Sequence, residues 1–189
     1  MRSFEIVAMV AGVGYAVLAA LRNRLCWISG AVSSAAAALA AGMRWLPMQS
    51  ALQVFFVGMS VYGWVSWSRK GTDDELAIGV WPPALHLGAA VAMIALTFIS
   101  AHLLATETSA AWPVLDSLTT WFSLLATWLA ARAKLENWLY WIAIDGVLLF
   151  LFYVQDLPFL ALLNLLYIGI AAAGYIAWRR RFMAQAVPT

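Results

Sequence analysis

LQVFFVGMSVYGWVSWSRK, the stretch from Leu52 to Lys70, is an apolar run that ends in two basic residues. A spanning α-helix needs about 20 mostly apolar residues, because the hydrocarbon core of a bilayer is about 30 Å thick. A membrane β-strand would instead alternate apolar and polar positions over about ten residues, and this stretch does not. The stretch therefore predicts a transmembrane helix that ends at a basic membrane face.

The same pattern recurs along the chain. Of its 189 residues, 65% are hydrophobic and 11% are charged, whereas a soluble domain has about 25% charged residues. Charges, prolines and turn residues divide the chain into apolar spans near residues 4–21, 27–41, 51–67, 83–104, 114–131, 138–154 and 159–178. We therefore predict an all-α integral membrane protein with seven transmembrane helices in a single domain, 1–189.

The basic residues predict the orientation of these helices. In a seven-span arrangement one face collects nine of the eleven basic residues, namely Arg22, Arg24, Arg69, Lys70, Arg132, Lys134, Arg179, Arg180 and Arg181. Only Arg2 and Arg44 fall on the other face. By the positive-inside rule, the N-terminus is expected outside and the C-terminus in the cytoplasm.

The chain also contains an internal repeat. A shift of 111 residues places Trp27 on Trp138, Pro47 on Pro158, Gly58 on Gly169, Gly63 on Gly174, Trp67 on Trp178, Arg69 on Arg180 and Gln53 on Asn164. The shift carries the first three spans onto the last three in the same direction. We predict two parallel three-helix repeats, 1–70 and 112–181, joined by a connector helix, 77–106. Transporters built in this way bind their substrate near the membrane midplane, between the halves.

The candidate site lies in the sixth span. Trp138, Trp141 and Asp145 have helical spacing i, i+3 and i+7, so they share one face, and Asn137 can join it. A carboxylate at membrane depth is costly unless it faces protein or water, which makes Asp145 a functional candidate. The alternative for Trp138 is a place in the interfacial aromatic belt.

Two amides occupy equivalent positions of the repeat, Gln53 and Asn164. They are expected either to bond between helices or to flank a solute. Trp67, beside two basic residues, is interpreted as an interfacial anchor. Aromatic faces with one carboxylate and amides suit a flat, cationic heteroaromatic solute, whereas a phosphate-bearing solute would need basic residues within the spans.

Other chemistries find little support. The sequence contains no phosphate-binding glycine loop and no plausible nucleophilic triad. The single cysteine, Cys26, excludes an intramolecular disulfide and a multi-cysteine metal site. His86 and His102 stand about 24 Å apart along one helix, too far to share a ligand, and are interpreted as isolated residues. We expect no catalysis, no cofactor, no metal and no nucleic-acid partner.

Several motifs resemble the PnuC family of bacterial vitamin transporters. They are the stretch quoted above, LENWLYWIAID from Leu135, WPVLDS from Trp112 and GYIAWR from Gly174. The resemblance implies a three-plus-one-plus-three arrangement similar to SWEET sugar transporters, in a bacterial inner membrane. It also implies uptake of nicotinamide riboside by facilitated diffusion, with trapping by a cytoplasmic vitamin kinase. The resemblance carries over Gln53, Asn137, Trp138 and Trp141 as substrate contacts, to which helix facing and the repeat add Asp145, Asn164 and Tyr167.

The identity of the solute stays open among relatives of this kind. The nicotinamide riboside branch often has Asn at the position of Asp145, whereas other branches carry thiamine, riboflavin or deoxynucleosides. A carboxylate attracts the pyridinium of nicotinamide riboside or the thiazolium of thiamine, and it gives neutral riboflavin no electrostatic gain. A non-transporting membrane subunit is the alternative of another class, and homo-oligomerisation is compatible with so small a carrier.

Overall fold

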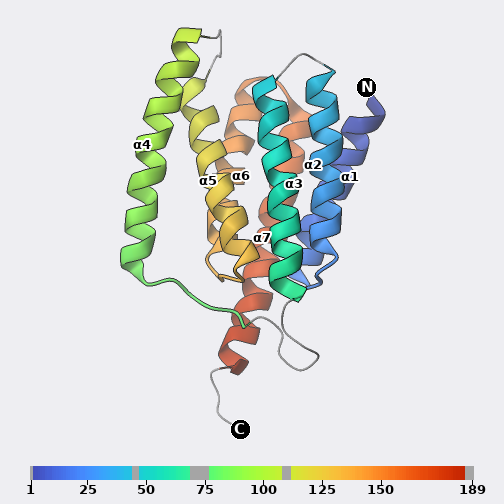
Figure 1. The fold of residues 1–189 in the computed structure, drawn as a ribbon, viewed down its shortest axis with the longest axis vertical. Coiled ribbons are helices and arrows are strands. Elements are labelled where there is room, and N and C mark those ends of the chain that lie inside the picture. The colour runs from blue at the N-terminus through green and yellow to red at the C-terminus, as the bar shows by residue number, and fades with distance from the viewer. Residues whose placement is uncertain (1, 44–46, 69–76, 108–111, 186–189) are drawn as a thin grey trace.

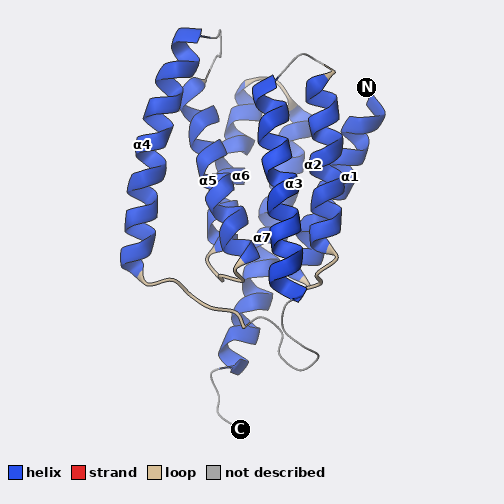
Figure 2. Cartoon of the chain, in the orientation of Figure 1, coloured by secondary structure: helices blue, strands red, loops and turns tan. Residues whose placement is uncertain are grey.

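The computed structural model describes residues 2–43, 47–68, 77–107 and 112–185, which form seven α-helices (Figure 1). The helices are α1 (Arg2–Ala20), α2 (Cys26–Gly42), α3 (Pro47–Ser68), α4 (Pro83–Glu107), α5 (Pro113–Ala131), α6 (Asn137–Val154) and α7 (Pro158–Gln185). Figure 2 shows these helices joined by loops, with no strand drawn in the described part of the chain. The predicted all-α class with seven helices is confirmed.

Prolines mark the helix starts. α3, α4, α5 and α7 each begin at a proline, a residue that suits the first turn because its missing N–H has no intrahelical partner there. The predicted ends agree with the structure within a few residues, except that α7 continues to Gln185, beyond the expected end at residue 178. The added turns carry Arg179, Arg180 and Arg181, which extend the helix past its apolar part.

The helices have the length and composition of membrane spans. Five of those described, α1, α4, α5, α6 and α7, are long and apolar enough to cross a membrane, and α2 is a shorter apolar helix of 17 residues. α3 has 22 residues, and its Gln53, Ser60 and Ser66 lower its hydropathy. The chain is a multi-pass membrane protein.

Six helices form a closed ring. α1 packs on α2, α2 on α3, α3 on α5, α5 on α6, α6 on α7, and α7 on α1. Among the described helices, the backbone of α4 lies close to that of α5 alone, its start reaches α6 through the His86 side chain, and Figure 1 shows it standing outside the ring. The 111-residue shift makes α1 equivalent to α5 and α3 equivalent to α7. The α1–α7 contact is therefore equivalent to the α5–α3 contact, as expected for two halves related by a two-fold axis.

Matched side-chain contacts support the repeat. Trp67 Nε1 of the first half donates to the Ala130 carbonyl of the second at 3.3 Å, and Trp178 Nε1 of the second donates to the Ala19 carbonyl of the first at 3.1 Å. Both partners are related by the shift of 111 residues. These matched contacts give a physical reason for the proposed division of the chain into the repeats 1–70 and 112–181.

Glycine positions follow the same correspondence. A methyl group added at Gly63 would overlap the Trp27 ring, and one added at Gly174 would lie 2.8 Å from the Trp138 ring. Only glycine lets each indole rest directly on the neighbouring helix backbone. This contact explains why these tryptophans and glycines match in one register.

The segment before α4 is pinned to the turn between α5 and α6. The Gly79 N–H donates to the Ala133 carbonyl at 3.1 Å, and the Leu135 N–H donates to the Gly79 carbonyl at 2.9 Å. The Trp81 N–H donates to Glu136 Oε1 at 2.6 Å. These bonds join the connector to the residues immediately before α6.

Most described basic residues lie at one end of the molecule. Figure 1 shows the α1–α2 and α5–α6 connections and the C-terminal end of α7 at the end opposite the N-terminus. These segments carry Arg22, Arg24, Arg132, Lys134 and the arginines at 179–181. Arg44, Arg69 and Lys70, which also entered the orientation argument, lie outside the described residues.

Candidate functional site

The ring encloses a cavity of about 290 Å³, here called the central cavity. This volume lies at the lower limit of small-molecule sites, which range over about 300–1,000 Å³, so the cavity suits a small solute. The structure brings six of the seven predicted site residues to its wall: Asn137, Trp138, Trp141, Asp145, Asn164 and Tyr167. Gln53 is half-buried on α3 and is not among the residues that line this cavity.

α6 supplies the polar groups of one wall. The buried Asn137 amide nitrogen donates to the Lys134 carbonyl at 2.6 Å, which fixes the side chain at the helix start. Asp145 is buried, two turns further along the helix. Among the described residues, no hydrogen bond or ion pair reaches its carboxylate. The carboxylate is therefore available to a solute in the cavity.

α7 supplies a second polar pair. Asn164 is buried, and its amide nitrogen donates to the Leu160 carbonyl at 2.8 Å. The amide oxygen keeps its capacity to accept a hydrogen bond. The Tyr167 hydroxyl lies so close to α1 that a methyl group added at Gly12 would be 2.8 Å from it. Glycine at this position lets the tyrosine reach across to α1.

The basic end of the cavity is lined by a tryptophan cluster, defined as Trp27, Trp67, Trp138 and Trp178. Ring centroids are 5.4 Å apart for Trp27 and Trp67, 6.0 Å for Trp67 and Trp178, and 5.5 Å for Trp138 and Trp178. The Arg22 guanidinium lies 4.8 Å from the Trp67 ring and 4.9 Å from the Trp178 ring. Edge-to-face and tilted ring contacts, with the two cation–π contacts of Arg22, thus lie between the cavity and the basic loops.

This arrangement corrects the interpretation of Trp67. Its position beside basic residues favoured an interfacial anchor, but the side chain turns inward, lines the central cavity and donates to a carbonyl of α5. Trp138 is likewise no member of an exposed aromatic belt, because only 3% of its surface is exposed. Close packing between the two halves outweighs the preference of indole for the headgroup region.

Two indole N–H groups at the cavity wall have no acceptor. Nε1 of Trp27 and Nε1 of Trp138 are buried without a hydrogen-bond partner among the described residues. A buried unsatisfied donor costs about 1–3 kcal/mol. Both residues line the central cavity, and the two nitrogen atoms themselves are buried within the packed rings.

The sequence predictions missed the contribution of the first half. Gly12, Tyr15, Trp27 and Trp67 of the first half line the central cavity, and so does Trp178 of the second half, which was also not predicted. The repeat matches among the tryptophans were a usable signal for three of them. Nothing in the uniformly apolar α1 distinguished Gly12 or Tyr15 from lipid-facing positions.

A second, smaller cavity adjoins the central one on the side of the first half. This serine cavity, of about 170 Å³, is lined by Ser33, Ser34, Ser60 and Thr127, together with the apolar Gly30 and Phe56. It shares Gly12, Tyr15, Trp27 and Trp141 with the central cavity. The two spaces therefore meet along a common wall.

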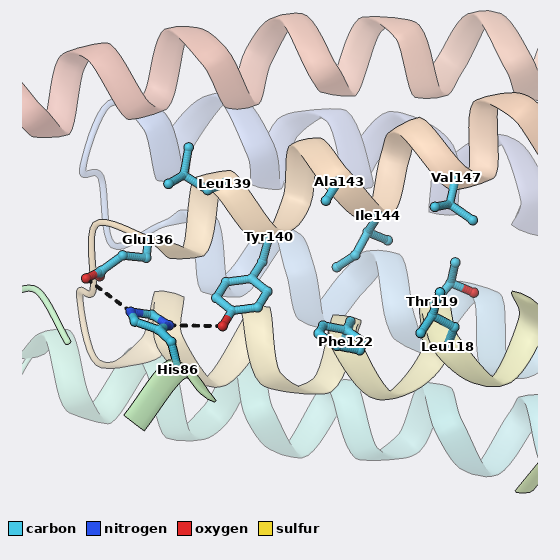
Figure 3. A pocket seen from close by; sticks show the side chains of 10 residues that line it. All are labelled: His86, Leu118, Thr119, Phe122, Glu136, Leu139, Tyr140, Ala143, Ile144 and Val147. Atoms are coloured by element: carbon cyan, nitrogen blue, oxygen red, sulfur yellow. Dashed lines mark hydrogen bonds and ion pairs between the residues drawn. The ribbon is translucent and has the colours of Figure 1, made fainter. Parts of the chain in front are cut away.

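A third space, the lateral groove, lies between α4, α5 and α6 outside the ring (Figure 3). Its volume of about 490 Å³ exceeds that of the central cavity, but most of its wall is apolar, with Leu118, Phe122 and Val147 among its lining residues. Polar groups gather at one end, where Figure 3 shows His86 between Tyr140 and Glu136. We place the solute site in the central cavity because polar groups from several helices converge there.

The histidines differ from expectation in one case. His86 Nδ1 lies 2.9 Å from the Tyr140 hydroxyl, and Nε2 lies 3.4 Å from Glu136 Oε1. His86 is thus a member of a polar cluster and not an isolated residue, because folding brings the start of α4 beside the start of α6. His102 is exposed on α4.

The chemistry of the central cavity is that of reversible binding. Asp145 supplies a carboxyl group, Trp141 supplies an aromatic face, and Asn137 and Asn164 supply amide oxygens. No group of three or more histidine, cysteine, aspartate or glutamate side chains within the described ranges could hold a metal ion. This donor set suits a cationic aromatic ring.

Known proteins with similar sequences share one description. The nicotinamide riboside transporter PnuC of Escherichia coli (strain K12) is 26% identical over 156 residues, which cover 67% of this chain and 64% of that protein. The protein of the same description from Shigella flexneri matches to the same extent. The chain thus spans less than two thirds of the length of these relatives.

A solved structure shares the fold. The crystal structure of the vitamin B3 transporter PnuC superposes with a TM-score of 0.77, covering 97% of this chain and 83% of that chain at 20% sequence identity. The family model described as nicotinamide mononucleotide transporter matches residues 2–180. Because that match spans nearly the whole chain, the chain belongs to the nicotinamide mononucleotide transporter family.

Proposed function

We propose that this protein carries a B-vitamin precursor, nicotinamide riboside, across a bacterial inner membrane. The observation that carries the proposal is that Trp141 and Asp145 line one cavity, with no described residue hydrogen-bonded or ion-paired to the Asp145 carboxylate. A pyridinium ring gains both from stacking on an indole and from a nearby carboxylate. The relatives named for transport of nicotinamide riboside support the same solute.

The mode of transport is proposed to be facilitated diffusion. Among the described residues Asp145 is the one carboxylate that lines the central cavity, and we assign it to the solute and not to a coupled ion. Net uptake then requires a cytoplasmic kinase that phosphorylates the vitamin and so prevents its return. Binding between two parallel halves that rock against each other provides the alternating access.

Thiamine is the second candidate, because its thiazolium ring is also cationic. Asp145 favours it over neutral riboflavin or a deoxynucleoside on the same electrostatic grounds. A non-transporting membrane subunit would need no solute site and predicts no binding of any of these compounds.

The test is calorimetric titration of the detergent-purified protein with nicotinamide riboside, thiamine and riboflavin in parallel. We expect nicotinamide riboside to bind most tightly. Asp145→Ala, which removes the charge together with both hydrogen-bonding oxygens, should weaken that binding about 10-fold, as loss of a contact worth about 1.5 kcal/mol implies. Tighter binding of thiamine would replace the proposed solute, and binding of none would favour the non-transporting role.

Transport itself is tested with the protein reconstituted in liposomes and the labelled vitamin added outside. Equilibration without any ion gradient is the expected result, with accumulation only when a nicotinamide riboside kinase and ATP are enclosed. Accumulation driven by a proton or sodium gradient alone would exclude facilitated diffusion.

A further inference from the structure

The lateral groove lies on the membrane-facing side of the ring, away from the central cavity. α5 and α6 form its walls, and His86 at the start of α4 lies at one end (Figure 3). Among the described helices, the backbone of α4 lies close to that of α5 and not to that of α6. α4 therefore does not cover the groove, which stays open to the surroundings of the bundle.

A small residue gives the groove its depth. Leu139, Ala143 and Val147 follow one another at intervals of four residues, so they form one stripe along α6. All three line the groove, and Ala143 is exposed. The alanine leaves room between two larger side chains. The rings of Phe122 and Tyr140, whose centroids are 6.1 Å apart, bound this room on the side of α5.

The polar groups of the groove are engaged within the protein. Thr119 Oγ1 donates to a carbonyl one turn earlier in α5 at 2.9 Å, and the Tyr140 hydroxyl lies 2.9 Å from His86 Nδ1. Glu136 Oε1 accepts the Trp81 N–H, while Glu136 Oε2 and His86 Nε2 are buried. The surface left to an occupant is nearly all apolar, which suits a hydrocarbon chain better than a polar solute.

The length of the groove matches one leaflet of a bilayer. It extends along α6 from Glu136 to Val147, which is about 16 Å at a helical rise of about 1.5 Å per residue. Half of a hydrocarbon core of about 30 Å is about 15 Å. Glu136 directly precedes α6 at the basic end of the molecule (Figure 1). The groove thus begins at headgroup level and ends near the midplane, as an extended acyl chain does.

The turn at which the groove begins is basic. Arg132 and Lys134 precede Glu136 in the α5–α6 turn, and Arg132 is exposed. Glu136 is the one acid of this turn, and its Oε1 lies 3.4 Å from His86 Nε2 in addition to accepting the Trp81 N–H. Each basic residue near a membrane surface attracts anionic lipid by about 1 kcal/mol. An anionic headgroup therefore complements this turn better than a zwitterionic one.

We infer that the lateral groove binds one acyl chain of an anionic phospholipid, phosphatidylglycerol, whose headgroup lies at the α5–α6 turn. The hydrocarbon core holds no water to fill such a notch, and an empty notch would lose dispersion contacts along both walls. This site is separate from the central cavity, so the inference does not depend on which solute the protein carries.

The test uses the full-length protein in liposomes of phosphatidylethanolamine that contain phosphatidylglycerol with a photoreactive group in one acyl chain. Adducts are located by mass spectrometry of peptides and should concentrate on Leu139, Ala143 and Val147. Ala143→Phe fills the notch and should abolish these adducts. Ala92→Phe is the matched control, because Ala92 is an exposed alanine of α4 that does not line the groove. It should leave the adducts unchanged.

The headgroup is tested at Lys134. With the probe at a limiting mole fraction, Lys134→Ala should lower the yield of groove adducts about fivefold, which corresponds to about 1 kcal/mol. Lys134→Arg keeps the charge and should retain the yield. A phosphatidylethanolamine probe with the same photoreactive chain should respond to neither variant. Apparent melting temperatures show whether each variant remains folded.

Each outcome bears on the inference. Loss of groove adducts in Ala143→Phe, with retention in Ala92→Phe, supports the acyl-chain site. Adducts spread evenly over all lipid-facing helices, or unaffected by Ala143→Phe, overturn it. Groove residues that escape the lipid probe and cross-link to a second copy of the chain overturn it as well, in favour of an interface between copies. Equal responses of both probes to Lys134→Ala overturn the anionic headgroup.

Discussion

Asp145 is the residue on which the choice of solute depends most. It is buried in an apolar helix, and no hydrogen bond or ion pair from the described residues reaches its carboxylate. A polar group in such a place is costly unless a partner arrives. Within the described part of the chain the carboxylate is thus left to a bound ligand or to solvent in the cavity, which is typical of a functional position in a membrane protein.

Trp141 provides the first prediction at this scale. Trp141→Ala should weaken binding of nicotinamide riboside by about 1–3 kcal/mol, because a stacking or cation–π contact is lost. Trp141→Phe retains an aromatic face and should lose less. Calorimetry of both variants provides the measurement, and unchanged affinity in a folded Trp141→Ala protein would remove this residue from the site.

Glycines at equivalent positions of the two repeats provide the second prediction at the residue scale. Gly63→Ala and Gly174→Ala should each lower stability by about 1–3 kcal/mol, because the added methyl group collides with the Trp27 or Trp138 ring. Gly58→Ala and Gly169→Ala are matched controls from the same repeat register, with no atom within 4 Å of the added methyl group. These controls should be neutral or stabilising, since alanine favours helices over glycine.

Apparent melting temperatures in one detergent compare the four glycine variants. The expected order places both controls at or above the unaltered protein and both tryptophan-facing variants below it. If all four variants melt at the same temperature, packing of the indoles is not the reason why glycine occupies positions 63 and 174.

At the scale of elements, the connector is more than a link between the repeats. Its first residues are bonded to the α5–α6 turn through Gly79, and Trp81 is bonded through its N–H to Glu136. Glu136 also lies beside His86 and immediately precedes Asn137, the first residue of α6. The start of the helix that carries the candidate site is thus held by the segment before α4.

Glu136 tests this attachment. Glu136→Ala removes the acceptor of the Trp81 N–H, so amide hydrogen exchange in residues 77–82 should become faster and the melting temperature should fall. Glu136→Gln keeps an acceptor oxygen and should restore most of the protection. Equal loss in both variants would show that the charge of Glu136, and not its hydrogen bond to the connector, stabilises this junction.

At the scale of the whole molecule, the ring places the halves face to face. The two indole hydrogen bonds that cross from one half to the other, from Trp67 and Trp178, are related by the repeat. They lie at the end of the cavity where the basic loops gather. Any rocking of one half against the other must therefore reorganise the tryptophan cluster.

The orientation of the whole molecule in the membrane is a further prediction. The basic end should face the cytoplasm, so a green fluorescent protein fused to the C-terminus should fluoresce and alkaline phosphatase fused there should be inactive. A control fusion of each reporter to the N-terminus behind an export signal should show the opposite activities. Active phosphatase at the C-terminus would show that the topology is the opposite of the proposed one.

Much of this fold could be predicted from residues alone, because bilayer thickness sets the length of each apolar run. That constraint determined the number of helices, the basic loops predicted their direction, and matched tryptophans and glycines indicated the repeat. Asn137, Trp138, Trp141 and Asp145 were also predicted together, since one helix face brings them into line. These are properties of single helices or of sequence register.

Only the tertiary structure decided which side of each helix faces the interior. Lipid-facing and cavity-facing sides of a membrane helix are both apolar, so periodicity carries little information about them. For this reason Gln53 proved to lie off the cavity wall, Trp67 turned inward, and α4 stands outside the ring. The serine cavity has the same origin, because its serine and threonine hydroxyl groups lie on α2, α3 and α5, and only close packing of these helices brings them together.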